Sequence, residues 1–128
     1  MTELDFVPLT SEQIRVACSI FWPSFEIVKG YPALSAPLGD PTLFRPEEFS
    51  GHDDRNVLAS YVESFNWIDL TDWIEGPMND SDAVAVQEVL VRTWQCSLNL
   101  LEFSIGVSAR PLSPEDTGDW FGVGVRVM

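Results

Sequence analysis

The chain has 128 residues, of which 45% are hydrophobic and 12% aromatic, and its formal net charge is −13 at pH 7. This length predicts one domain, residues 1–128, and the hydrophobic content excludes the composition of disordered chains. Seven Lys and Arg against 20 Asp and Glu disfavour nucleic acid and anionic membranes as partners and favour a basic protein. Alternatively, the acidic residues only keep the protein soluble, so the net charge by itself does not decide the function.

The N-terminal region predicts a helix followed by a β-hairpin. Thr10 and Gln13 have the spacing of a capping box, and Pro23 ends the helix that they begin. The expected core-facing residues recur at helical spacing: Ile14, Ala17, Cys18 and Phe21. Residues 25–28 and 31–34 then read as two strands joined by a tight turn.

The middle of the chain predicts a long connection and a second helix. Residues 35–50 are rich in proline and predict a surface loop with one helical turn near Pro46. The apolar spacing after Asp53 and Asp54 predicts a helix that one of them caps and that ends near Asn66. A further short turn is expected at 71–75.

The stretch 81–102 predicts the central core helix. Polar residues form one narrow stripe at steps of three and four: Glu88, Arg92, Gln95, Asn99 and Glu102. The remaining circumference is mostly apolar, so other elements are expected to cover it. Cys18 and Cys96 lie in these predicted apolar helices, which predicts two buried thiols and no disulfide or metal pair.

After this helix the apolar period changes from 3.6 to 2, so 103–110 and 120–127 predict two half-buried strands with a long loop between them. The element order is therefore α-β-β-α-α-β-β. Segregated helices and strands predict an α+β fold with a mostly antiparallel sheet covered on one face by helices.

Glycines gather on one face of the predicted C-terminal hairpin. If Val107 pairs with Val123, then Gly106 lies opposite Gly124, and Gly122 shares that face. Arg110 and Trp120 also fall on it. Glycine in a strand indicates close approach by another backbone, a ring or a partner, and this predicts self-association as a homodimer as one alternative. A hairpin that needs bends is the other reading.

The segment Phe21-Trp22-Pro23-Ser24-Phe25, which joins a helix to a strand pair, and the later Val91-Arg92-Thr93-Trp94 resemble a loose group of small uncharacterised bacterial proteins with a "WPxF" entry into a sheet. The resemblance covers about half of the chain and departs from the group at the proline-rich loop. It implies an α+β fold and a bacterial source, and it implies no activity.

Chemistry-bearing motifs are scarce. His52 is the one histidine and precedes Asp53 and Asp54, but a single triplet cannot complete a metal coordination sphere, so no metal site is predicted. Nucleophile elbows, Gly-rich phosphate loops and zinc spacings are missing from the sequence, and no catalytic residue or cofactor is predicted. A small enzyme or ligand-binding domain that uses carboxylates near residues 35–54 remains the alternative.

Acids concentrate between Glu47 and Asp82, where ten of them face one base, Arg55, and bracket several aromatics. Acid interleaved with aromatic anchors is what a surface that captures a basic protein needs. The predicted partner-binding residues come from this tract and from the glycine face: Glu63, Asp69, Asp72, Trp73, Glu75, Gly106, Gly122 and Gly124. Helix caps and core tryptophans are the competing explanation.

The sequence therefore favours a non-catalytic acidic binding protein that neutralises or regulates a basic protein, of the toxin-immunity type. The alternatives are the small enzyme or ligand-binding domain and a self-associating structural subunit. Glu3 and Asp5 stand where a secretory signal carries basic residues, and no apolar run approaches a membrane span, which predicts a cytoplasmic location.

Overall fold

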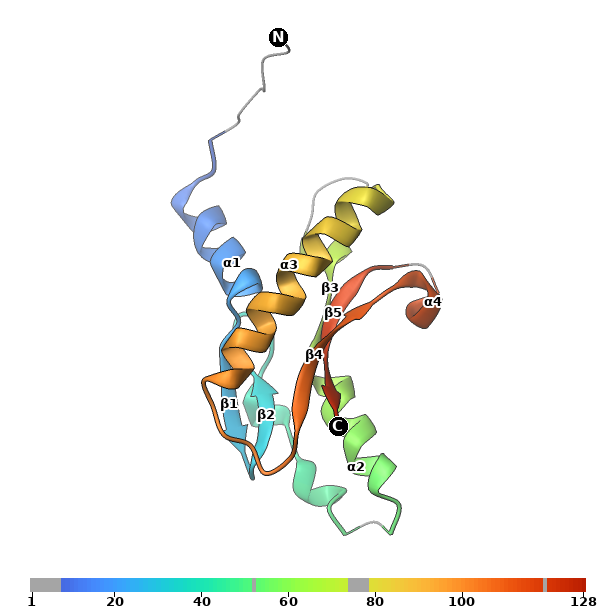
Figure 1. The fold of residues 1–128 in the computed structure, drawn as a ribbon. Coiled ribbons are helices and arrows are strands. Elements are labelled where there is room, and N and C mark those ends of the chain that lie inside the picture. The colour runs from blue at the N-terminus through green and yellow to red at the C-terminus, as the bar shows by residue number, and fades with distance from the viewer. Residues whose placement is uncertain (1–7, 52, 74–78, 119) are drawn as a thin grey trace.

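A computed structural model of the chain describes residues 8–51, 53–73, 79–118 and 120–128. The helices and strands follow one another as α1 (Ser11–Phe21), β1 (Phe25–Val28), β2 (Tyr31–Leu34), α2 (Arg55–Phe65), β3 (Trp67–Asp69), α3 (Asp80–Asn99), β4 (Val107–Leu112), α4 (Pro114–Thr117) and β5 (Gly122–Val127) (Figure 1). Short 3₁₀ helices lie in the connections: η1 (Pro41–Leu43), η2 (Pro46–Glu48) and η3 (Leu70–Trp73). Helices combined with antiparallel sheets confirm the α+β class.

The predicted order of elements was incomplete in two places. β3 follows α2 directly, and α4 interrupts the connection between the last two strands. β3 was missed because three residues are too few to show an alternating pattern. The helix predicted for 81–102 ends at Asn99, and the strand predicted from Phe103 begins only at Val107.

Local signals fixed the N-terminal elements. The side chains and backbone N–H groups of Thr10 and Gln13 exchange hydrogen bonds of 2.9 and 3.1 Å, so the predicted capping box is present. β1 and β2 pair antiparallel around Lys29 and Gly30, whose φ angles of 55° and 90° give the turn that a two-residue hairpin requires. The helical turn expected near Pro46 is η2.

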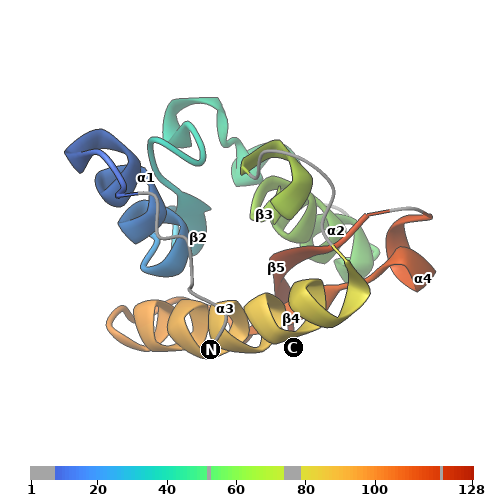
Figure 2. The ribbon, with the colours of Figure 1, turned by 90° about the horizontal axis from the view of Figure 1, so that it is seen from above.

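A second sheet contains β3, β5 and β4 in that order, and all its pairs are antiparallel. Figure 2 shows α3 beside β4, and α2 and β3 beyond β5. The sheet face that carries Ile68, Val123 and Val125 packs into the main core with α1, the β1–β2 hairpin and α3. The opposite face points toward α4.

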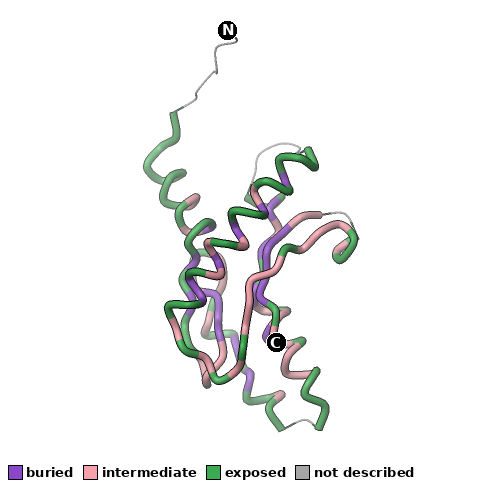
Figure 3. The backbone as a smooth tube through the Cα atoms, viewed as in Figure 1, coloured by how far each residue is buried: buried purple, intermediate pink, exposed green. Residues whose placement is uncertain are grey.

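α3 packs through one side only, which corrects the expectation that most of its circumference is covered. Its buried residues are Ala83, Gln87, Leu90, Trp94, Ser97 and Leu98. The predicted polar stripe is exposed or half-buried, but the apolar Val84, Val89 and Leu100 are 46%, 47% and 72% exposed as well (Figure 3). The periodicity gave the helix correctly, but the number of neighbours around it depends on tertiary contacts that periodicity does not encode.

α1 and the two cysteines also differ from expectation. α1 buries Ile20, and Val16 packs against the same core, whereas the predicted inward residues Ile14 and Phe21 are 50% and 37% exposed. Cys18 and Cys96 are both exposed free cysteines, so the prediction of buried thiols was wrong. Both lie on helix faces that no other described element covers.

Asn66 ties the two sheets together. It ends α2 as expected, is fully buried, and its Oδ1 accepts the N–H of Leu34 at 2.8 Å. Its Nδ2 donates to the carbonyls of Pro32 and Val62 at 2.8 and 2.9 Å, and its own carbonyl accepts the N–H of Val125 at 2.9 Å. The Asn66 side chain therefore satisfies the hydrogen-bonding groups of β2 and of the end of α2, and the Asn66 backbone extends the hydrogen-bond ladder of β5.

Candidate functional site

The open face of the β3–β5–β4 sheet is the most distinctive surface of the fold. Residues in register across antiparallel strands share a face, and one row on this side consists of Trp67, Gly124 and Arg110. The row has a bulky residue on each outer strand and none in the middle. The central glycine leaves space above β5 for the side chains on either side.

The two buried glycines of β5 accommodate other parts of the same chain. A Cβ atom at Gly122 would lie 2.2 Å from the carbonyl oxygen of Ile68 and 2.7 Å from the ring of Trp120. At Gly124 the nearest atom would be Cβ of Trp67 at 3.2 Å. The close approach expected from these glycines is therefore made by backbone atoms and side chains of the same chain.

The register predicted for the last hairpin was wrong. Val107 pairs with Val127 and not with Val123, so Gly106 lies beyond the paired strands, where its carbonyl accepts the N–H of Met128 at 2.9 Å. The face bearing three glycines is therefore not formed. Alternation fixes the face of each residue, but it does not separate registers that differ by an even number of residues.

Two indoles form the wall of a pocket on this face. The rings of Trp67 and Trp120 stack with centroids 5.1 Å apart and an interplanar angle of 22°. The cavity beside them has a volume of about 300 Å³, and its lining includes Glu63, Arg110, Asp116 and Gly124. We name these four residues and the two tryptophans the indole pocket.

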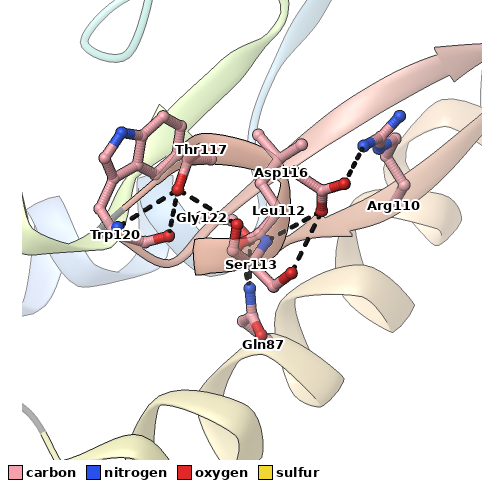
Figure 4. Close-up of polar contacts among 8 residues, drawn as sticks. All are labelled: Gln87, Arg110, Leu112, Ser113, Asp116, Thr117, Trp120 and Gly122. Atoms are coloured by element: carbon pink, nitrogen blue, oxygen red, sulfur yellow. Dashed lines mark hydrogen bonds and ion pairs between the residues drawn. The ribbon is translucent and has the colours of Figure 1, made fainter.

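Asp116 and Thr117 of α4 hold one side of the pocket in place (Figure 4). The Asp116 carboxylate accepts the N–H and the hydroxyl of Ser113, each at 3.2 Å, and lies 3.6 Å from the Arg110 guanidinium. The Thr117 hydroxyl lies 2.7 Å from the carbonyl oxygen of Trp120 and 3.2 Å from its N–H. Short local bonds therefore fix the segment that carries the second indole.

α3 supports the pocket from below. The Nε2 atom of Gln87, a residue only 6% exposed, donates to the carbonyls of Leu112 and Gly122 at 2.6 and 2.7 Å. These carbonyls belong to the end of β4 and the start of β5, on either side of α4. Gln87 therefore fixes the base of the hairpin loop that places Trp120 (Figure 4).

A larger cavity of about 640 Å³ adjoins the indole pocket, with which it shares Glu63 and Arg110. Arg126 also lines it, so this cavity has two guanidinium groups against one carboxylate. Glu63 lies between the two cavities, and its Oε2 accepts the N–H of Val127 at 3.0 Å. The lining of the larger cavity therefore has one positive charge in excess, and that of the indole pocket has one negative charge in excess.

The structure brings together only part of the predicted partner-binding set. Glu63 and Gly124 line the indole pocket, and Asp69 and Gly122 are paired in the next row of the sheet. Asp72 and Trp73 follow in η3 and are exposed, and Gly106 lies at the opposite end of β4. Glu75 lies outside the described residues.

The aromatics of the acidic tract have different roles. Tyr61 is half-buried: it stacks on Phe44 and Phe49, and its hydroxyl accepts the N–H of Arg45 at 2.8 Å, so it packs against the second core cluster. Trp67 is 41% exposed and Trp73 37%. Trp120 was not predicted as a site residue, although its place on the glycine face of the expected hairpin was the signal that could have identified it.

Among the described residues, no group of three or more His, Cys, Asp or Glu side chains is placed to hold a metal ion. His52 lies outside these residues, and Asp54 caps α2 by accepting the N–H of Asn56 at 2.9 Å. In the same part of the chain, no helix combines the length and apolarity that spanning a membrane requires.

Comparison of the chain with protein-family models, curated proteins and solved structures gives no match. The argument for function therefore depends on the site alone. The site consists of two stacked, solvent-accessible indoles, the carboxylates of Glu63 and Asp116 next to them, and Gly124 beneath them. These groups suit recognition of a positively charged side chain and include no activated nucleophile.

Proposed function

We propose that the protein is a non-catalytic acidic binding protein that captures a basic protein, of the toxin-immunity type, and that the indole pocket anchors the complex. Long-range negative charge accelerates the encounter, and desolvated aromatic side chains then hold the partner. A cavity of about 480 Å³ whose lining includes Ser50 and Asp54 lies where the small-enzyme alternative would be placed, but the stacked indoles give the indole pocket the aromatic anchors that a protein partner needs.

The observation that carries the proposal is the accessible Trp67–Trp120 stack next to Glu63 and Asp116. Trp and Arg are among the residue types most enriched at interface hot spots. A large indole that is exposed beside a cavity contributes binding energy when a partner covers it and removes it from water. The charge argument supports the same conclusion. Arg110 and Asp116 form the one ion pair within 4.0 Å in the described parts of the chain. The negative electrostatic field of the other acids there is therefore not cancelled by paired bases.

The test neutralises four acids of the predicted surface with isosteric amides. The variant carries Glu63→Gln, Asp69→Asn, Asp72→Asn and Glu75→Gln. It should slow association with a basic partner by roughly tenfold at low salt, because these charges steer the encounter. Amides keep the acceptor oxygens that bond to Val127 and Thr71, so the fold should be retained.

A matched control removes the same amount of charge elsewhere. Four exposed acids on α1, β1, α3 and the segment after α3 serve this purpose: Glu12, Glu26, Glu88 and Glu102. Stopped-flow kinetics then give the association rate constant of each variant with a basic partner recovered by affinity capture. Comparing the two rate constants separates the effect of these four acids from the effect of net charge. Equal slowing by the two variants, or no slowing by either, would contradict the proposal that this surface is the docking site.

A further inference from the structure

The indole pocket presents a rigid aromatic surface. The indole N–H of Trp67 donates to the carbonyl of Ser64 at 2.7 Å, and the ring stacks on Trp120, yet 41% of the residue is exposed. Gly124 lies below it, and a Cβ atom there would lie only 3.2 Å from Cβ of Trp67 and 3.3 Å from Cδ1 of Leu112, so Trp67 packs closely on the sheet. A ring that is already fixed loses little conformational freedom when a ligand covers it.

The pocket also holds a carboxylate oxygen with capacity to accept. Glu63 is half-buried, and Oε2 accepts the N–H of Val127, whereas the structure records no donor for Oε1 within the described residues. Arg110 and Arg126 line the adjoining cavity, but neither lies within 4.0 Å of the Glu63 carboxylate in the described structure. Glu63 can therefore accept from a ligand without breaking an existing ion pair.

The charge balance of the pocket favours a cation. Its lining contains the carboxylates of Glu63 and Asp116 against the single guanidinium of Arg110. Arg110 is 3.6 Å from Asp116, and Figure 4 shows it across Asp116 from the Trp120 ring. The lining therefore carries one negative charge in excess, and its one guanidinium is already paired with Asp116, in a chain whose net charge is −13.

We propose that the indole pocket accepts an arginine side chain of the basic partner, whose guanidinium stacks on the Trp67–Trp120 pair and donates to Oε1 of Glu63. This inference rests on the proposed function and names the group that the partner presents. The cavity of about 300 Å³ is at the small end of ligand sites, which suits one side chain better than a larger ligand.

Arginine fits this site better than lysine for two reasons. Its guanidinium is planar and weakly hydrated, so it stacks on an aromatic face at low desolvation cost. Its forked donors can also bond to a carboxylate while the plane stays on the ring. A lysine ammonium is a compact, strongly hydrated charge that uses the flat indole surface less well.

The test titrates the protein with capped tripeptides Gly-X-Gly in which X is arginine, lysine or neutral citrulline. Indole N–H NMR signals report binding at about 0.15 M salt, where long-range charge is largely screened. Arginine should shift the Trp67 and Trp120 signals and bind roughly tenfold more tightly than lysine, and citrulline should leave them unchanged.

Variants locate the site. Glu63→Gln keeps an acceptor for Val127 and should weaken arginine binding by roughly tenfold, because a charge-assisted bond is lost. Trp67→Leu should weaken it to a similar degree. Trp22 is 51% exposed, and neither Trp22 nor Glu88 lines the indole pocket, so Trp22→Leu and Glu88→Gln are the matched controls that should leave arginine binding unchanged.

The outcomes separate this inference from the proposed function. Equal affinities for arginine and lysine peptides, or an affinity that Glu63→Gln leaves unchanged in a variant that melts like the wild type, would overturn the arginine site. If arginine binding fails but a basic protein still associates at a salt-dependent rate, the proposed function stands and this inference falls. If the peptide binds at the pocket but no basic protein does, the inference stands and the proposed function falls.

Discussion

Replacing Gly122 by alanine should strongly destabilise the protein. The added Cβ atom would lie 2.2 Å from the carbonyl oxygen of Ile68, a contact that real Cβ atoms do not make. Neither side can move easily, because Ile68 belongs to the β3–β5 ladder and the carbonyl of Gly122 accepts the Gln87 amide at 2.7 Å. The substitution must therefore separate β3 from β5 or shift α3.

Overpacking of a rigid site costs about 1–3 kcal/mol, and clash with a backbone atom places this substitution at about 3 kcal/mol. For a chain of 128 residues, that lowers the Tm by roughly 10 °C. Urea unfolding followed by tryptophan fluorescence gives the free energy of unfolding directly. Loss of the Trp67–Trp120 stack should accompany the change, because the Trp120 ring is only 2.7 Å from the same Cβ position.

Two other glycines are matched controls. A Cβ atom at Gly106 would meet only Cβ of Met128, at the ordinary distance of 3.5 Å, and one at Gly51 would meet nothing within 4 Å. Alanine at either position should stay within about 0.5 kcal/mol of the wild type. A Gly122→Ala protein as stable as these controls would refute the register and the packing that we describe.

Three further predictions concern single groups. Gln87→Leu should lower the free energy of unfolding by about 2 kcal/mol in a urea titration, since it leaves two strand carbonyls without their donor. Cys18 and Cys96 should both react with a thiol reagent in the folded protein at rates near those of the unfolded chain, because both are exposed. Hydrogen bonds from Thr42, chiefly from its side chain and secondly from its backbone N–H, hold the pKa of Asp40 below 3.8. The small contribution of this carboxylate to stability should therefore be present above pH 3.8 and disappear as the pH falls through the lowered pKa, which an NMR titration can follow.

Each of these predictions has a result that would contradict it. Glu88→Leu, on the exposed side of the same helix, controls for the added apolar group, and equal effects of the two substitutions would show that Gln87 has no supporting role. A thiol that reacts only after unfolding would contradict the exposed positions of Cys18 and Cys96. An Asp40 carboxyl that titrates above 3.8 would contradict the bonds to Thr42.

Local signals in the sequence were sufficient for most of the elements. The capping box of Thr10 and Gln13 and the turn at Lys29-Gly30 depend on neighbouring residues only, and both were predicted and confirmed. The strand alternation also put Gly122, Gly124 and Arg110 on one face, as the structure does. Such features need no knowledge of the distant chain.

The features that were missed depend on distant contacts. β3 exists because Trp67 and its neighbours extend the β5 ladder, and three residues in isolation do not indicate a strand. The register of β4 with β5 is fixed partly by Gln87, which bonds to both sides of the hairpin loop from α3. The indole pocket follows from these two contacts, so its assembly from Trp67 and Trp120 could not be derived from spacing.

The most direct test of the central claim is the salt dependence of association with a basic partner recovered by affinity capture. If negative charge captures the partner, the association rate constant should fall steeply as ionic strength rises, and the dissociation rate constant should change little. Trp67→Leu should instead accelerate dissociation, because an anchor acts after docking. An association rate constant that is indifferent to salt would contradict the account.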